Sequence, residues 1–172
     1  MKLLKSILSL SFCAGISASA TAQMRPMTYA ETTVEASPSD VFLDWTTANS
    51  IQAFFAPQAT IEPKQGGLYK LCFAPDAPEG ECGNDRGRIL ALQPNEMISF
   101  TWDMPPYMTE IRPHQTVVQV LLSPVGDNKT RVRLFHTGYG TGDSWDEGRA
   151  YFDRVWPTVL DNYRDFKANP RP

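Results

Sequence analysis

The spacing of hydrophobic and polar residues divides the chain into segments of different period. A short alternating stretch, MTYAETTVEA, predicts an edge strand. The segment SPSDVFLDWT then predicts a helix, because Ser37 is a good N-cap and Pro38 suits the first helical position. A second short helix is predicted from Asn49 to Phe55, just before Pro57.

Between residues 59 and 137 apolar and polar residues alternate, which is typical of strands. Turn sequences such as KQGG, QPNE and PVGDN separate most of these runs. The predicted strands are Ala59–Glu62, Leu68–Phe73, Gly87–Gln93, Met97–Asp103, His114–Ser123 and Thr130–Thr137. The proline-rich segment DMPPYMTEIRP predicts a longer loop at one end of the sheet.

The last part of the chain predicts one long helix with a broad apolar face. Ser144 and Glu147 have the spacing of a capping box at its start. The residues of the face recur at three- and four-residue steps and are Trp145, Phe152, Val155, Trp156, Val159, Tyr163 and Phe166. Antiparallel strands followed by a helix on one face make an α+β domain, in which a curved sheet wraps around the long helix.

Strand parity predicts which side chains meet that helix. Because Arg131 and Arg133 must face water, Val132, Leu134 and His136 face inward. The same rule gives further inward residues: Tyr69, Leu71, Phe73, Ile98, Phe100, Trp102, Thr116, Val118 and Val120. This mostly apolar set with a few polar groups has the composition of a ligand pocket and equally that of a packed core.

The pocket hypothesis rests on the aromatic rings. Rigid rings that oppose one another across a curved sheet tend to leave gaps, and an empty apolar gap lowers stability unless a ligand occupies it. We therefore expect a mainly apolar internal cavity of roughly a few hundred Å³. Its predicted ligand-binding residues are Trp45, Phe54, Tyr69, Phe100, Trp102, His136, Phe152 and Trp156. If these rings are instead in mutual contact with no void between them, they form an ordinary core.

Residues 1–22 are predicted to be a secretory signal peptide. Lys2 and Lys5 precede an apolar run that is too short to span a bilayer, and an A-x-A cleavage site ends at Ala22. A lipid on Cys13 is the alternative. No later segment is long and apolar enough to cross a membrane, so residues 23–172 are expected to form one exported domain, periplasmic or secreted.

Charge and cysteine content narrow the choice of partner and compartment. The 172-residue chain has a formal net charge of −3 and no cluster of basic residues, which argues against nucleic acid as a partner. In an oxidising compartment, Cys72 and Cys82 are close enough in sequence to predict a disulfide. Such a bond would add roughly 3 kcal/mol of stability. Two unlinked thiols are the alternative.

Candidate catalytic residues are few. The sequence lacks G-x-S-x-G, H-E-x-x-H and C-x-x-C, and its GYGTG segment has no βαβ context. His136 is the candidate acid or base, because its ordinary pKa suits proton transfer near neutrality. The alternative is an interior histidine with a hydrogen-bond partner. Asp103 and Glu110 adjoin a loop that could edge the pocket, and we expect both to be solvated.

The two histidines are not expected to share a metal ion. Pairing Ser123 with Thr130 across the turn places Val117 opposite His136. His114, on the same face near the strand end, is then about 10 Å away along the strand. Since no third ligand is evident, we predict neither a metal nor another cofactor.

Two parts of the sequence resemble one known family. They are VEASPSDVFLDWTTANSIQAFFAPQATIEPKQGGLYKL, and GRILALQPNEMISFTW with the later TRVRLFHTGYG and WDEGRAYFDRVWPTVLDN. Both look like the activator-of-Hsp90-ATPase homologue-like family of the START/SRPBCC superfamily. The resemblance covers roughly residues 28–167 and implies a helix-grip fold with an internal cavity between sheet and helix. The superfamily includes lipid carriers, hormone receptors and polyketide cyclases, so the resemblance implies no single reaction.

Three hypotheses of function follow. The leading one is an exported protein that binds a small apolar or amphipathic molecule without catalysis. The second is a cyclase- or hydrolase-like enzyme that uses His136 as acid or base on such a molecule. The third is a domain that binds a partner protein. The co-chaperones that give the family its name are cytosolic, so an exported chain would not meet their partner.

Overall fold

The computed structural model describes residues 27–169 of the chain. The predicted signal peptide and Cys13 lie outside these residues. The order of elements along the chain is β1 (Thr28–Val34), α1 (Pro38–Thr46), α2 (Ala48–Phe54), β2 (Gln58–Ile61), β3 (Tyr69–Cys72), β4 (Gly83–Asn84), β5 (Ile89–Gln93), β6 (Met97–Asp103), β7 (Gln115–Gly126), β8 (Lys129–Thr137) and α3 (Asp143–Ala168).

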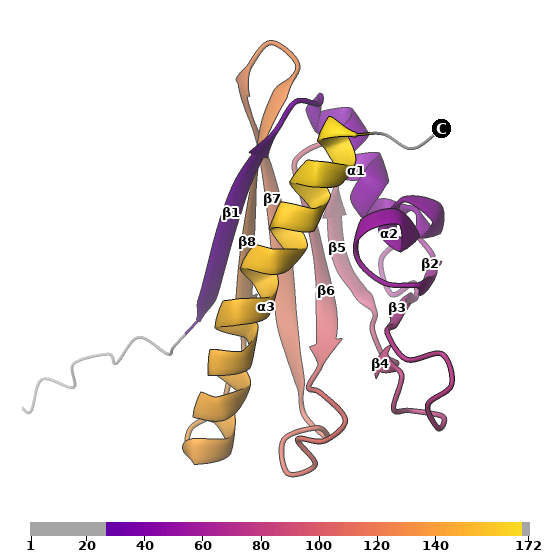
Figure 1. The fold of residues 1–172 in the computed structure, drawn as a ribbon, viewed down its shortest axis with the longest axis vertical. Coiled ribbons are helices and arrows are strands. Elements are labelled where there is room, and N and C mark those ends of the chain that lie inside the picture. The colour runs from indigo at the N-terminus through magenta and orange to yellow at the C-terminus, as the bar shows by residue number, and fades with distance from the viewer. Residues whose placement is uncertain (1–26, 170–172) are drawn as a thin grey trace, which may run out of the picture.

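The main layer is a five-stranded antiparallel sheet in the order β1-β8-β7-β6-β5. It curves around α3, which crosses its face (Figure 1). β1 is an edge strand, as its pattern predicts. The expected α+β helix-grip architecture, with two short helices after the first strand, is confirmed.

The sequence predicts one sheet, whereas β2, β3 and β4 form a second sheet of three strands. An isolated bridge between Leu68 and Arg88 lies between the two sheets. β4 has only two residues, and they lie in a segment whose Pro and Gly residues indicate turns. A strand this short has no alternation that a sequence pattern could reveal.

The first short helix, α1, is anchored at both ends. At the start of α1 the Ser37 hydroxyl accepts a hydrogen bond of 3.2 Å from the N–H of Asp40, which confirms the predicted N-cap. Later in α1 the buried carboxylate of Asp44 accepts from the Tyr163 hydroxyl at 2.9 Å and from Lys167 Nζ at 2.8 Å. These two bonds fix α1 against the end of α3.

The start of α3 differs from the prediction. Its N-cap is Gly142, with φ of 104°, and no side chain caps the helix. The Ser144 hydroxyl donates to the carboxylate of Glu110 instead. The predicted capping box with Glu147 is therefore wrong, because the loop between β6 and β7, which lies beside the start of α3, supplies the acceptor for Ser144.

The side chains of β8 alternate between inward and outward positions as predicted. Val132, Leu134 and His136 have no exposed surface, Arg131 is exposed and Arg133 is half-buried. On the neighbouring strand, the predicted inward residues are buried as well: Thr116, Val118 and Val120. These side chains, with those of β6 and α3, form the core.

The predicted register of β7 against β8 is wrong by one residue. Val118 pairs with His136, and Val117 pairs with Thr137. The shift arises at the hairpin, where a bulge lies between Pro124 and Gly126. His114, expected on the inward face, precedes β7 and is exposed, with its ring 5.8 Å from that of Trp145.

Candidate ligand-binding groove

A groove of about 700 Å³ lies between α3 and two loops, and it is open to solvent. One loop joins β3 to β4, and the other joins β6 to β7. Both extend beyond the sheets at the end of the domain where α3 begins (Figure 1). The aromatic residues of its lining are Phe55, Phe73, Trp102, Tyr107, Tyr151 and Phe152.

Contacts between these rings form a continuous apolar surface. Phe55 stacks on Trp102, with centroids 5.7 Å apart and 4° between the planes. Phe73 lies 5.6 Å from Phe55, and Phe152 lies 6.5 Å from Trp102. Phe73 was predicted to face the core, yet 42% of its surface is exposed. β3 ends at Cys72, so strand parity no longer applies to Phe73.

The β6–β7 loop rests directly on the first turns of α3. Met104, Met108 and Ile111 are buried in this contact. The absence of a side chain at Gly148 of α3 makes the contact possible, because a Cβ there would lie 2.9 Å from Cδ1 of Ile111. The loop that carries one wall of the groove is therefore packed in place.

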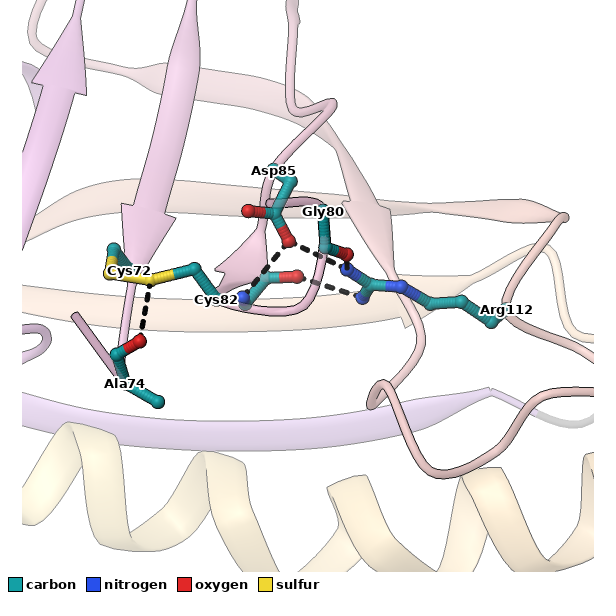
Figure 2. The surroundings of a disulfide bond; sticks show 7 residues. Cys72, Ala74, Gly80, Cys82, Asp85 and Arg112 are labelled. Atoms are coloured by element: carbon teal, nitrogen blue, oxygen red, sulfur yellow. Dashed lines mark hydrogen bonds and ion pairs between the residues drawn. A yellow bond between two sulfur atoms is a disulfide. The ribbon is translucent and has the colours of Figure 1, made fainter. Parts of the chain in front are cut away.

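Arg112 joins the β6–β7 loop to the β3–β4 segment (Figure 2). Its guanidinium donates to the carbonyl oxygens of Gly80 at 2.7 Å and Gly83 at 2.8 Å, and to that of Met104. It also forms an ion pair of 2.6 Å with the carboxylate of Asp85. One side chain thus connects both walls of the groove, and its donors are occupied by protein acceptors.

A second arginine, Arg86, lies just after β4 and also holds the β6–β7 loop. Arg86 Nη2 lies 2.8 Å from Oδ1 of Asp103 and also donates to the carbonyl oxygen of Arg112 at 2.6 Å. Asp103 lines the groove, but only 3% of it is exposed. The prediction of a solvated Asp103 is wrong, because Arg86 covers its carboxylate. Glu110 is exposed, as expected.

The two cysteines lie at the edge of the groove. Their sulfur atoms are within bonding distance, and the Cα atoms of Cys72 and Cys82 are 4.7 Å apart. The carbonyl oxygen of Cys82 accepts a hydrogen bond of 2.7 Å from the N–H of Phe73. Cys82 and Phe73 both line the groove, so a bond between the sulfur atoms would tie this wall to β3 (Figure 2).

The structure brings two of the eight predicted ligand-binding residues, Trp102 and Phe152, to the groove. Phe54 lies at a second hollow of about 350 Å³, between α2 and the end of α3. The other five are in the core with no exposed surface: Trp45, Tyr69, Phe100, His136 and Trp156.

Those core rings fill the space in which an internal cavity was expected. Tyr69 and Phe100 stack with centroids 3.9 Å apart. Trp156 lies 5.0 Å from Trp102, with its ring at 61° to that partner. The helix and sheet faces thus close on each other through their rings, and the open space lies beyond them, between the loops.

Among the aromatic residues of the groove, three were in neither the predicted ligand-binding set nor the predicted inward-facing set. Phe55 follows α2, Tyr107 lies in the β6–β7 loop, and Tyr151 lies on α3 beside the predicted apolar face. The proline-rich DMPPYMTEIRP segment, already recognised as a long loop, was the available signal for Tyr107.

His136 makes hydrogen bonds through both ring nitrogens. Nδ1 lies 3.0 Å from Nε1 of Trp156, whose indole N–H can only donate, so Nδ1 is an acceptor. Nε2 therefore carries the proton and donates to the Thr116 hydroxyl at 2.6 Å. Thr116 in turn donates to the carbonyl oxygen of Trp102 at 3.1 Å, and the Tyr139 hydroxyl lies 2.8 Å from Nδ1.

Burial lowers the pKa of His136 from 6.5 to about 3. The imidazole is neutral near pH 7, and it is not among the residues that line the groove. This geometry fits the interior-histidine alternative and gives no support to an acid or base role. Among residues 27–169 no group of three or more His, Cys, Asp or Glu side chains could hold a metal ion. In the same range, no helix combines the length and hydrophobicity that a membrane span requires.

Comparison with known proteins gave matches at the level of family and fold. A family described as activator of Hsp90 ATPase homolog 1-like protein matches residues 35–165. Comparison with curated protein sequences gave no match.

Solved structures of the same fold share little sequence with this chain. The solution structure of the Aha1 dimer from Colwellia psychrerythraea is 18% identical with a TM-score of 0.64, covering 86% of this chain and 100% of that one. PFC0360w, an Hsp90 activator from Plasmodium falciparum, is 16% identical with a TM-score of 0.61, over 85% and 99% of the two chains. CalU16 from Micromonospora echinospora is 19% identical with a TM-score of 0.61, over 83% and 76%.

Proposed function

We propose that this chain, which belongs to the activator of Hsp90 ATPase homolog 1-like family, binds a small apolar or amphipathic molecule in the groove between α3 and the two loops. The observation that carries the proposal is the groove itself, with its continuous surface of aromatic rings. Its volume of about 700 Å³ falls in the usual range of small-ligand sites.

The walls of the groove support binding because they are already fixed. Arg112 connects the two loops, Arg86 connects the turn after β4 to the β6–β7 loop, and the β6–β7 loop is packed on Gly148 of α3. A ligand that enters a preformed site does not have to order loops, so more of its contact energy appears as affinity.

Two polar groups that the sequence suggested for the site, Asp103 and His136, are placed in a way that supports binding without catalysis. The carboxylate of Asp103 is paired with Arg86, and the neutral imidazole of His136 lies behind the wall. Neither is placed as a free acid or base beside a bound molecule.

Export is part of the proposal. The positive, apolar and A-x-A segments of residues 1–22 favour it. The close approach of Cys72 and Cys82 fits an oxidising compartment, where a bond between them would persist.

The test uses N-phenyl-1-naphthylamine, a neutral probe whose fluorescence rises in apolar surroundings. We expect saturable binding with one probe per chain. Val155→Trp should weaken it by about tenfold, because an indole inside the groove would occupy apolar surface that the probe needs.

Val125→Trp is the matched control, since Val125 is exposed near the β7–β8 hairpin and is not part of the groove. This variant should bind the probe as the unmodified protein does. Absence of saturable binding, or equal affinities of the two tryptophan variants, would contradict the proposal.

A further inference from the structure

The part of the groove lining that the structure describes carries no positively charged side chain. Among the described residues that line it, none is a lysine, an arginine or a histidine. Arg112 and Arg86 lie close behind the walls, but their donors are engaged by Asp85, Asp103 and loop carbonyl groups. Among residues 27–169, an anionic head group in the groove would find no lysine, arginine or histidine of the lining to pair with.

A carboxylate stands at the edge of the same groove. Glu81, in the β3–β4 loop, is exposed and lines the groove. Within residues 27–169 it forms no ion pair. Its negative charge is therefore available to a positively charged group of a ligand.

Exposed aromatic rings of the same groove add to this attraction. Phe73 is hydrogen-bonded through its N–H to the residue after Glu81, and 42% of its surface is exposed. Tyr107, on the other loop, is 65% exposed. Both rings line the groove, and the faces of such rings attract ammonium groups. The formal net charge of −3 for the whole chain favours the approach of a cation as well.

We propose that the ligand is an amphipathic cation, with its apolar body on the rings of Trp102 and Phe152 and its ammonium group beside Glu81. This proposal rests on the proposed function, because it names the chemical class of the molecule that the groove takes. The charge of the groove, and not its shape, selects this class over fatty acids and other amphipathic anions.

The experiment measures displacement of N-phenyl-1-naphthylamine by three molecules that share a ten-carbon chain. Decyltrimethylammonium is cationic, decan-1-ol is neutral and decanoate is anionic, and all are used below their micelle concentrations at low salt. We expect decyltrimethylammonium to displace the probe at the lowest concentration and decanoate at the highest. Added salt should reduce this difference, because it screens charges at the protein surface.

Glu81→Gln removes the charge and keeps the size of the side chain. It should weaken the binding of decyltrimethylammonium by about threefold, which is the effect of a solvent-exposed charge pair. The binding of decan-1-ol should not change. Glu79→Gln is the control, because Glu79 is an exposed acid of the same loop that does not line the groove. This control variant should bind all three molecules as the unmodified protein does.

The outcomes separate the two proposals. If the neutral probe does not bind, the groove is not a ligand site and both proposals fail. If the probe binds but decanoate competes as well as decyltrimethylammonium, or Glu81→Gln changes nothing, the cationic ligand is refuted and ligand binding stands.

Discussion

Acid should destabilise this fold through His136. Burial holds the pKa of its imidazole at about 3 in the folded chain, against an ordinary value of 6.5 in the unfolded chain. Below 6.5 the unfolded chain therefore binds a proton that the folded chain does not. The stabilisation is fully present above pH 6.5 and is lost as the pH falls toward 3.

The expected loss of stability follows from the pKa shift of His136. At about pH 4.5, two units below the unfolded pKa, the free energy of unfolding should be lower by about 3 kcal/mol, since each pKa unit corresponds to about 1.4 kcal/mol. Such a loss is a large fraction of the stability of a typical domain, which is about 5–15 kcal/mol.

Urea unfolding of the unmodified protein and of His136→Asn, from about pH 8 to pH 4.5, measures this contribution. Near pH 8 the variant should be less stable by about 1–3 kcal/mol, because Thr116 and Trp156 lose a buried partner. The difference in stability between the two proteins should then change by about 3 kcal/mol at the lower pH, since all other titrating groups are common to both proteins. A gap that stays constant would refute the assignment of a buried neutral histidine.

Three further outcomes are expected. Reductant should raise the intact mass by about two daltons if Cys72 and Cys82 are bonded, and an unchanged mass would show free thiols. Asp44→Asn should lower the free energy of unfolding in urea by about 1–3 kcal/mol, because it removes a buried carboxylate that accepts hydrogen bonds from Tyr163 and Lys167. An unchanged urea midpoint would contradict this. Arg112→Gln should weaken binding of the neutral probe and speed amide hydrogen exchange in both loops. The control Arg131→Gln, at an exposed position, should do neither. Equal exchange in the two variants would show that Arg112 does not hold the loops.

Much of the fold could be predicted because its signals are local. The alternation in β8 places Val132, Leu134 and His136 in the core, since Arg131 and Arg133 at the alternate positions must reach water. Ser37 caps α1 through a bond to a residue only three positions away. Where the physical cause lies within a few residues, the sequence pattern contains it.

The groove could not be predicted because its causes are not local. Asp103 is covered by Arg86, and Arg112 reaches across to Gly80, contacts that exist only after both loops fold. Parity pointed to rings such as Tyr69 and Phe100 as pocket walls, but it does not determine whether two facing rings leave a gap or stack. They stack, and the free space lies at the loops.

The position of a bound probe tests the central claim most directly. A crystal structure of the protein with N-phenyl-1-naphthylamine should show its rings against Trp102 and Phe152, between α3 and the two loops, with the core rings unmoved. Electron density for the probe among Trp45, Tyr69 and Trp156 inside the core, or at the hollow between α2 and the end of α3, would contradict the assignment of the groove as the ligand site.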